Sequence, residues 1–431
     1  MPDVLHIKNA LIASADSPAL TPAHLLIVGG TITRLGEDIG TVPGVARSFD
    51  CGGTKIVVPA LFDLNVHLSE PGRTDKESIA SGTEAAIHGG VTGVVAMPST
   101  SPPIDSGGLV RTVLDIAARE ARIPVHTAGC ITRARDGKEM AGIGSMAEAG
   151  VRMITDDAPV PNPLVLRLAM EYAREFDLVV ACHCETPELS GQGAMNEGAR
   201  SYKLGIPGIP TMSEEIALER DIRIAKHTGC AVHVQHVSTA HGVEIIKRFK
   251  DEGVQVTCEV TPHHLLFNEE HIVDYDSNYK TAPPLRTPAD NAALLEGLAS
   301  GVFDVIASDH SPHTDFEKQQ QDFTSSPFGI IGLETALVSL FHHFIEPGTL
   351  TWDIIARHYS SNPRSILGLD PVRVAEGAPA EFLIFNPDAT TTFSRELLQS
   401  KSINTPFLGQ SLHGRVDFVI RDGNTLLNRF D

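Results

Sequence analysis

Eight short apolar runs rich in β-branched residues recur along the chain, and they constrain its fold more than any other feature. They cover residues 56–67, 91–97, 125–131, 151–155, 178–183, 231–237, 254–260 and 302–307. Helical patterns separate most of them, at residues 77–88, 109–122, 163–176, 213–227, 242–251 and 289–298. Strands that alternate with helices pair in parallel through right-handed crossovers. Eight such units predict an α/β fold, a (β/α)₈ TIM barrel.

The two ends of the chain have a different pattern, with short strand-like pieces broken by glycine and proline. Such pieces lie at residues 25–28 and 31–33, and the style resumes at 381–385 and 416–420. Chain termini often lie close together, so two all-β flanks can form one domain. We therefore predict a small β-sandwich domain from residues 1–57 and 372–431, around a barrel domain at residues 58–371.

The charge balance excludes several classes of partner. A formal net charge of −20 over 431 residues argues against a nucleic-acid surface, which needs clustered Lys and Arg. No apolar run approaches the roughly 20 residues of a membrane-spanning helix, and the start of the chain lacks the pattern of a secretory signal. The six cysteines are scattered among apolar runs, which favours reduced, buried thiols. We expect a cytoplasmic protein with a small-molecule substrate and no nucleic-acid or membrane partner.

Imidazoles and carboxylates follow several of the predicted strands. These residues are His67, the pair Asp156 and Asp157, His183, His236 and Asp309. A lone histidine at a strand end is more often a structural group. Five strand ends with such residues are hard to assign to packing, because every buried polar group needs its own partner. In a barrel, catalytic groups gather at the C-terminal ends of the strands, and these residue types suit Zn²⁺. The pattern predicts a metal site.

The first of these strand ends carries an anomaly. Asn65-Val66-His67 has the form of a metal-binding H-x-H strand end whose first histidine has become asparagine. A neutral amide is a poor Zn²⁺ ligand beside imidazole. The sequence therefore raises the question of whether the site is a working one.

Ordered sequence blocks along nearly the whole chain resemble the bacterial-type (class I) dihydroorotases of the cyclic amidohydrolase superfamily. The blocks are Glu70-Pro71-Gly72 followed by Lys76-Glu77, Met97-Pro98-Ser99-Thr100, Thr155-Asp156-Asp157, Cys182-His183-Cys184-Glu185, His233 to Thr239, Thr261-Pro262-His263-His264, Ala282-Pro283-Pro284, Ser308 to His313, Pro327-Phe328-Gly329 and Ser400 to Phe407. The resemblance implies a barrel with a β-sandwich and the interconversion of N-carbamoyl-L-aspartate and dihydroorotate in pyrimidine biosynthesis.

The resemblance also implies roles for individual residues. Two Zn²⁺ sites are implied, the first with Asn65, His67, Asp157 and Asp309, the second with Asp157, His183 and His236. Asp309 is implied as the catalytic group that takes a proton from the attacking water and returns it to the leaving nitrogen. Substrate contacts are implied for His313, Phe328 and Gly329. With Asn65 a doubtful ligand, we expect one or two Zn²⁺ per chain.

The chain departs from the family pattern at four positions. It has Asn65, Ser69, Ser99 and Ala282 where the family has His, Arg, Asn and often Asn. Of these, Ala282 matters least, since functional members also carry alanine there. The Arg and Asn replaced by Ser69 and Ser99 hold the substrate carboxylate, and their loss costs on the order of 3–6 kcal/mol.

Three functions follow from these departures. The first is an active dihydroorotase, the second an amidohydrolase for a different cyclic amide. The third is a non-catalytic homologue that supports aspartate transcarbamoylase. The resemblance further implies a homodimer or a mixed assembly with that transcarbamoylase. Arg73 is either a replacement cation for the lost carboxylate contacts or a surface residue.

Overall fold

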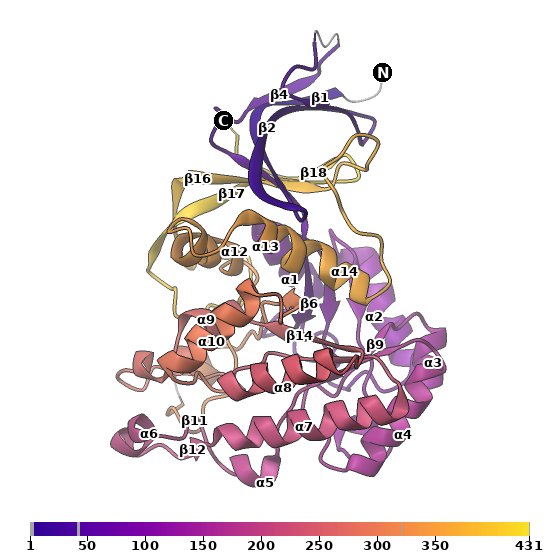
Figure 1. Ribbon diagram of the computed structural model, residues 1–431, viewed down its shortest axis with the longest axis vertical. Helices are drawn as coiled ribbons and strands as arrows, with labels where there is room; N and C mark the ends of the chain where they lie inside the picture. The colour runs from indigo at the N-terminus through magenta and orange to yellow at the C-terminus, as the bar shows by residue number, and fades with distance from the viewer. Residues whose placement is uncertain (1–3, 41–43, 320, 431) are drawn as a thin grey trace.

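The computed structural model describes residues 4–40, 44–319 and 321–430, and it places a barrel beneath a curved sheet built from both ends of the chain (Figure 1). The barrel strands are β6 (Leu61–Val66), β7 (Val91–Ala96), β8 (Val125–Thr127), β9 (Met153–Ile154), β10 (Val179–Cys182), β13 (Val232–Val234), β14 (Val256–Val260) and β15 (Val305–Ile306). All their pairings are parallel. The TIM barrel is therefore confirmed.

Two single bridges close the ring of barrel strands. Gly129 pairs with Ile154 between the β8 and β9 segments, and Val66 pairs with His310 between β6 and the end of β15. One apolar cluster joins side chains from strands on different sides of the ring, including Leu64, Met97 and Ala181. Side chains from such strands can meet only inside the barrel, so this cluster fills its interior. The rim at the C-terminal ends of the strands is left for polar groups.

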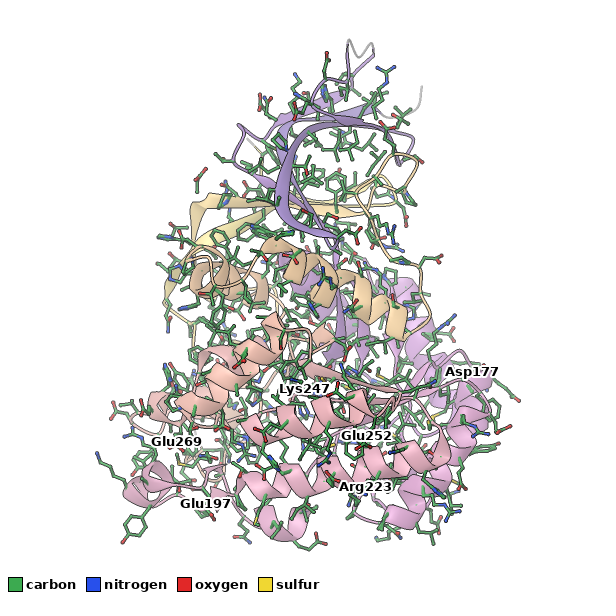
Figure 2. All side chains as sticks on the ribbon, viewed as in Figure 1. Asp177, Glu197, Arg223, Lys247, Glu252 and Glu269 are labelled. Atoms are coloured by element: carbon green, nitrogen blue, oxygen red, sulfur yellow. The ribbon has the colours of Figure 1, made fainter. Side chains whose placement is uncertain are left out.

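The predicted helices are present, with ends that differ by at most two residues. They are α1 (Ile79–His88), α2 (Gly107–Glu120), α4 (Pro163–Arg174), α7 (Thr211–Thr228), α8 (Ala240–Asp251) and α10 (Pro288–Ala299). Their outer faces carry charge, as the exposed Arg223 on α7 and Lys247 on α8 show (Figure 2). None of the helices in the described ranges is long and apolar enough to cross a bilayer.

The terminal sheet has strands from both flanks of the chain. It contains β1 (Val4–Ser14), β2 (Ser17–Val28), β3 (Thr31–Gly36), β4 (Arg47–Asp50), β5 (Ile56–Pro59), β16 (Phe382–Thr392), β17 (Ser411–Arg421) and β18 (Asn424–Asn428). Its order is β18-β17-β16-β5-β1-β2-β3, with β4 beside β1. A core of side chains such as Ile7, Leu25, Phe382 and Phe418 joins the two flanks, and an ion pair of 2.7 Å links Lys55 to Asp417.

Several barrel strands are shorter than the predicted runs, as β8 ends at Thr127 within the run 125–131, and one predicted run is divided between two sheets. The run at residues 56–67 is two strands, because β5 ends at Pro59 and β6 starts at Leu61. The first part pairs with β16 in the terminal sheet, where Phe382 lies opposite Pro59. Both parts are wholly buried, so no polar residue marks the change of sheet. The domain boundaries at 57/58 and 371/372 stay predictions, and β5 runs two residues past the first.

The cysteines match the prediction of reduced, buried thiols. All six are free and buried. Burial raises the pKa of Cys51 to about 12 and that of Cys230 to about 11. The thiols therefore stay protonated and behave as small apolar groups.

Candidate active site

The five predicted metal-ligand residues lie at the ends of β6, β9, β10, β13 and β15. The Nε2 atom of His67 is 3.7 Å from Asp157 Oδ1 and 3.7 Å from Asp309 Oδ1. The Nδ1 atom of His183 is 3.0 Å from His236 Nε2. Nitrogen and oxygen atoms of the kinds that bind Zn²⁺ therefore face each other at the mouth of the barrel.

Neighbouring carboxylates raise the pKa of two of these histidines, whereas burial and the neighbouring His183 lower the pKa of His236. Burial opposes protonation of His67, but the carboxylates of Asp157 and Asp309 outweigh it and raise its pKa. Burial likewise opposes protonation of His183, and Glu185, with its carboxylate 3.2 Å from Nε2, raises that pKa. An excess of buried acceptors suits a bound cation.

Backbone geometry sets three of these residues apart. Asp157, His236 and Asp309 have φ angles of 48°, 33° and 47°, in the left-handed region that few residues other than glycine adopt. Such strain persists where the surrounding structure holds it, and it gathers at functional sites. The distortion comes immediately after the strands, where it turns these side chains toward the mouth.

The structure assigns different roles to the two neighbouring aspartates. Asp156 is buried and accepts hydrogen bonds from the backbone N–H groups of Ile131 (2.8 Å) and Thr132 (2.9 Å). Asp157 faces His67 instead, and Arg135 donates to its backbone carbonyl oxygen (2.8 Å). These contacts support Asp157 as the ligand and give Asp156 a structural role.

Asn65 is fully buried beside this cluster. Its amide nitrogen donates to Glu259 Oε1 at 2.9 Å, and its Oδ1 atom is buried with no hydrogen-bond partner among the described residues. His236 Nδ1 is buried without a partner in the same way. Buried oxygen and nitrogen atoms are nearly always satisfied. The orphaned Oδ1 of Asn65, together with the paired imidazoles, fits a site that takes a cation.

The two serines that replace family residues have different surroundings. Ser99 Oγ lies 3.0 Å from Nδ1 of His67. A proton on Nδ1 directs the free Nε2 of His67 toward Asp157 and Asp309, which is how an outer hydroxyl orients a metal-binding imidazole. Ser69 has a φ of 56° and lines the adjacent cavity. Ser99 is therefore engaged with His67, a role that sequence reasoning missed.

A cavity of about 310 Å³ opens beside His67 and Asp157. Among the predicted substrate contacts, Ser69, Ser99, His313 and Phe328 line it, whereas Gly329 and Ala282 are not among its lining residues. Gly329 has a φ of 120°, and a Cβ atom there would lie 2.5 Å from the Ser311 side chain. Its role in the described structure is thus to let the loop pass close to Ser311.

Two positively charged side chains, Arg73 and Lys76, also line the cavity. Arg73 is 45% exposed and bound to Asp75 (2.8 Å) and Glu317 (3.1 Å). Lys76 is only 14% exposed, with Nζ 3.0 Å from Glu317 Oε1 and 3.0 Å from His313 Nδ1. Arg73 therefore lines the cavity with its guanidinium paired to two carboxylates, and its role as a replacement cation stays a prediction.

A segment of the C-terminal flank, residues 399–404, supports the loops around this cavity. Its Asn404 donates to the carbonyl oxygens of Ser311 (2.9 Å) and Gly329 (3.1 Å), and accepts from the N–H of His313 (3.0 Å). Its Ser402 donates to the carbonyl oxygen of Lys76 (2.8 Å). Residues far apart in the sequence thus fix both Lys76 and His313.

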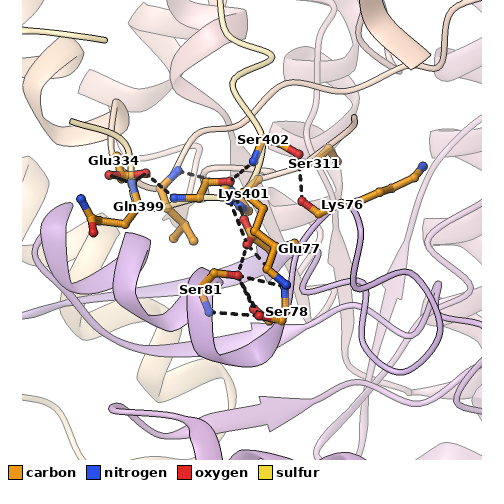
Figure 3. Close-up of polar contacts among 12 residues, drawn as sticks. Lys76, Glu77, Ser78, Ser81, Ser311, Glu334, Gln399, Lys401 and Ser402 are labelled. Carbon is orange, nitrogen blue, oxygen red and sulfur yellow. Dashed lines mark hydrogen bonds and ion pairs between the residues drawn. The ribbon is translucent and has the colours of Figure 1, made fainter. Parts of the chain in front are cut away.

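Glu77 is the buried centre of the contacts beneath that segment (Figure 3). Its carboxylate accepts from Ser400 Oγ (2.5 Å), the N–H of Lys401 (3.3 Å) and Ser81 Oγ. It also lies 3.2 Å from Nε2 of His310, the residue after Asp309. Glu77 therefore connects the start of α1, the 399–404 segment and the end of β15.

Glu334 holds the same segment from the other side (Figure 3). It accepts from the backbone N–H groups of Gln399 (2.9 Å) and Ser400 (3.2 Å). Burial raises its pKa from 4.5 to about 8. Between those two pH values the folded protein keeps a proton that the unfolded chain releases, so stability falls as pH rises through this window.

We expect Glu334→Gln to flatten this dependence. Between pH 5 and 8.5 the free energy of unfolding of the wild type should fall, relative to the variant, by on the order of a few kcal/mol. Denaturant unfolding at several pH values measures the difference. The exposed Glu188 provides a control, as Glu188→Gln, which should follow the wild type. Parallel curves for wild type and Glu334→Gln would contradict the expectation.

Comparison with solved structures shows which known proteins share this fold. L-hydantoinase (dihydropyrimidinase) from Arthrobacter aurescens superposes with a TM-score of 0.87 at 23% identity, covering 100% of this chain and 97% of that one. Dihydropyrimidinase from Brevibacillus agri NCHU1002 gives a TM-score of 0.84 at 22% identity, with coverages of 99% and 96%. The chain therefore has the fold of these two proteins.

Sequence comparison identifies the family. A family model described as dihydro-orotase-like matches residues 54–242. A dihydroorotase of Caldanaerobacter subterraneus subsp. tengcongensis is 41% identical over 419 residues, which are 97% of this chain and 96% of the relative. A dihydroorotase of Solibacter usitatus is 39% identical over 424 residues, 98% of each chain. The chain belongs to the dihydroorotase family, whose members are metal-dependent amidohydrolases.

Proposed function

We propose that the protein hydrolyses the ring amide of dihydroorotate and closes N-carbamoyl-L-aspartate in the reverse direction, as a step of pyrimidine biosynthesis. The observation that carries the proposal is that His67 faces Asp157 and Asp309, and His183 faces His236, at the ends of barrel strands where a cavity of about 310 Å³ opens beside His67 and Asp157. An abandoned site has no physical reason to keep so many buried polar groups or three strained backbones.

The proposed cofactor is Zn²⁺, one or two ions per chain. His67, Asp157 and Asp309 would hold the first ion, with Asn65 Oδ1 as a weaker fourth ligand. His183, His236 and Asp157 would hold the second. When bound, the metal supplies Lewis acidity toward the ring carbonyl and activates water at neutral pH.

The chain's own residues complete the reaction. Asp309 accepts a proton at its carboxylate from the attacking water and returns it to the ring nitrogen as the C–N bond breaks. Ser99 keeps Nε2 of His67 turned toward Asp157 and Asp309. Phe328 and His313 close one wall of the cavity and limit the water that reaches the bond.

Turnover and metal content of the purified protein test this proposal. Hydrolysis of L-dihydroorotate with one or two zinc ions per chain is the expected result, lost on treatment with a chelator and regained with Zn²⁺. Turnover of an uncharged cyclic amide alone would replace the proposal with a changed substrate. Neither metal nor turnover, with co-purification of aspartate transcarbamoylase, would support the scaffold role instead.

We expect Ser99→Ala to lower Zn²⁺ affinity by about 10- to 100-fold, because the hydroxyl that orients His67 is removed. Competition with a coloured chelator measures the dissociation constant. Ser99→Thr keeps the hydroxyl and serves as the matched control. An unchanged constant in the alanine variant would contradict the assigned role.

The assembly state belongs to the same proposal. We infer a homodimer, or a mixed assembly with aspartate transcarbamoylase, from the family alone. Light scattering of the protein alone and mixed with that transcarbamoylase decides between a monomer, a dimer and a mixed complex.

A further inference from the structure

The cavity must hold the negative group of its substrate without the Arg and Asn typical of the family. Both replacements, Ser69 and Ser99, are neutral, and Ser99 is engaged with His67. Of the described residues that line the cavity, the cations are Arg73 and Lys76, and the remaining basic groups are His67 and His313. The question is which of these can meet an anion.

His313 has no N–H group to offer. Its Nε2 donates to the carbonyl oxygen of Phe328 at 2.8 Å. That places the proton on Nε2, so Nδ1 is an acceptor and receives a hydrogen bond from Lys76 Nζ at 3.0 Å. Burial and the nearby Lys76 ammonium lower the pKa of His313 to about 3, in keeping with a neutral ring. The imidazole therefore positions Lys76.

Arg73 is already neutralised. Its Nε and Nη2 atoms donate to the two carboxylate oxygens of Asp75 at 2.9 and 2.8 Å, a bidentate pair. Nη2 also contacts Glu317 at 3.1 Å. The side chain is 45% exposed, so solvent and salt screen the charge that remains.

Lys76 has the position that Arg73 lacks. Its side chain is 14% exposed, and Ser402 donates a hydrogen bond to its backbone carbonyl oxygen. The ammonium has three N–H groups. His313 and Glu317 use two of them, which leaves one for a further acceptor in the cavity. A substrate carboxylate can therefore accept a hydrogen bond from the third N–H of Lys76 while His313 and Glu317 keep the other two.

We propose that Lys76 is the residue that binds the acidic group of the substrate and so determines specificity for a cyclic amide that carries a carboxylate. The inference rests on the proposed function and deepens it. His313 and Glu317 position the ammonium, and its third N–H donates to the substrate carboxylate. A charge-assisted hydrogen bond in a partly desolvated site supplies recognition that a serine hydroxyl cannot.

The test compares L-dihydroorotate with dihydrouracil, which has the same ring and no carboxylate. Lys76→Met keeps the length of the side chain and removes the charge, and Lys76→Arg keeps the charge. We expect Lys76→Met to raise KM for dihydroorotate about 10- to 100-fold, with kcat changed less than about threefold and dihydrouracil unaffected. Lys76→Arg should recover most of the loss. The exposed Lys203, as Lys203→Met, is the control.

Calorimetric binding of dihydroorotate to the same zinc-loaded proteins separates this inference from the proposed function. If the wild type binds dihydroorotate without turnover and Lys76→Met loses binding, the function fails and the inference holds. If the wild type turns over dihydroorotate and Lys76→Met has an unchanged KM, or loses both substrates equally, the inference fails and the function holds. No binding by the wild type overturns both.

Discussion

Asp309→Asn should lower kcat/KM for dihydroorotate by about 10³-fold, within the range that general acid–base catalysis contributes. The amide has the shape of the carboxylate, but it cannot accept the proton of the attacking water. The substitution also removes one of the two carboxylates that lie 3.7 Å from Nε2 of His67. The rate of dihydroorotate hydrolysis, monitored by the loss of ring absorbance, measures the effect.

Unfolding temperature and zinc content separate a chemical defect from a structural one. The unfolding temperature should stay close to the wild type, and the zinc equivalent assigned to Asp157, His183 and His236 should be retained because those ligands are unchanged. The exposed Asp388 on the terminal sheet gives a matched control, as Asp388→Asn, with full activity expected. A loss smaller than tenfold in Asp309→Asn would show that another group moves the proton.

Glu77→Ala should destabilise the protein by on the order of 3–5 kcal/mol, the cost of breaking a buried charged network. The change leaves the N–H of Lys401, the hydroxyl of Ser400 and Nε2 of His310 without their acceptor, and it also opens a cavity. The shift in denaturant midpoint measures the loss.

The matched variant Glu77→Gln keeps one acceptor oxygen and most of the volume, so it should lose clearly less stability than Glu77→Ala. Activity of both variants should fall as well, since His310 follows Asp309 in the chain. Equal stability of Glu77→Ala and the wild type would show that the 399–404 segment is held without this carboxylate.

Much of the fold could be predicted because a barrel repeats one simple pattern. Most residues of the barrel strands are apolar, and several helices end at a glycine, such as Gly89 after α1 and Gly229 after α7, so the units are visible in the sequence. The exception at residues 56–67 shows the limit. Periodicity gives the extent of an apolar run, but it carries no information about which sheet the run joins.

The candidate site likewise has residues whose position the sequence predicts and contacts that it does not predict. Strand ends that gather at one rim bring His67, Asp157, His183, His236 and Asp309 together, so their position in the sequence was sufficient. The partners of Ser99, Lys76 and Glu77 depend on loops from distant parts of the chain. No sequence spacing predicts such contacts. A substitution that removes a family residue, as at Ser99, can therefore form a new contact that only the structure shows.

The 399–404 segment makes the barrel dependent on the other end of the molecule. Asn404 and Ser402 hold the two loops that carry His313 and Lys76, and they come from the flank that builds the terminal sheet. A barrel cut free of its flanks would keep its strands and lose the walls of its cavity. Exchange of such barrels between relatives by recombination is therefore constrained, because the catalytic rim and the C-terminal flank must be inherited as one unit.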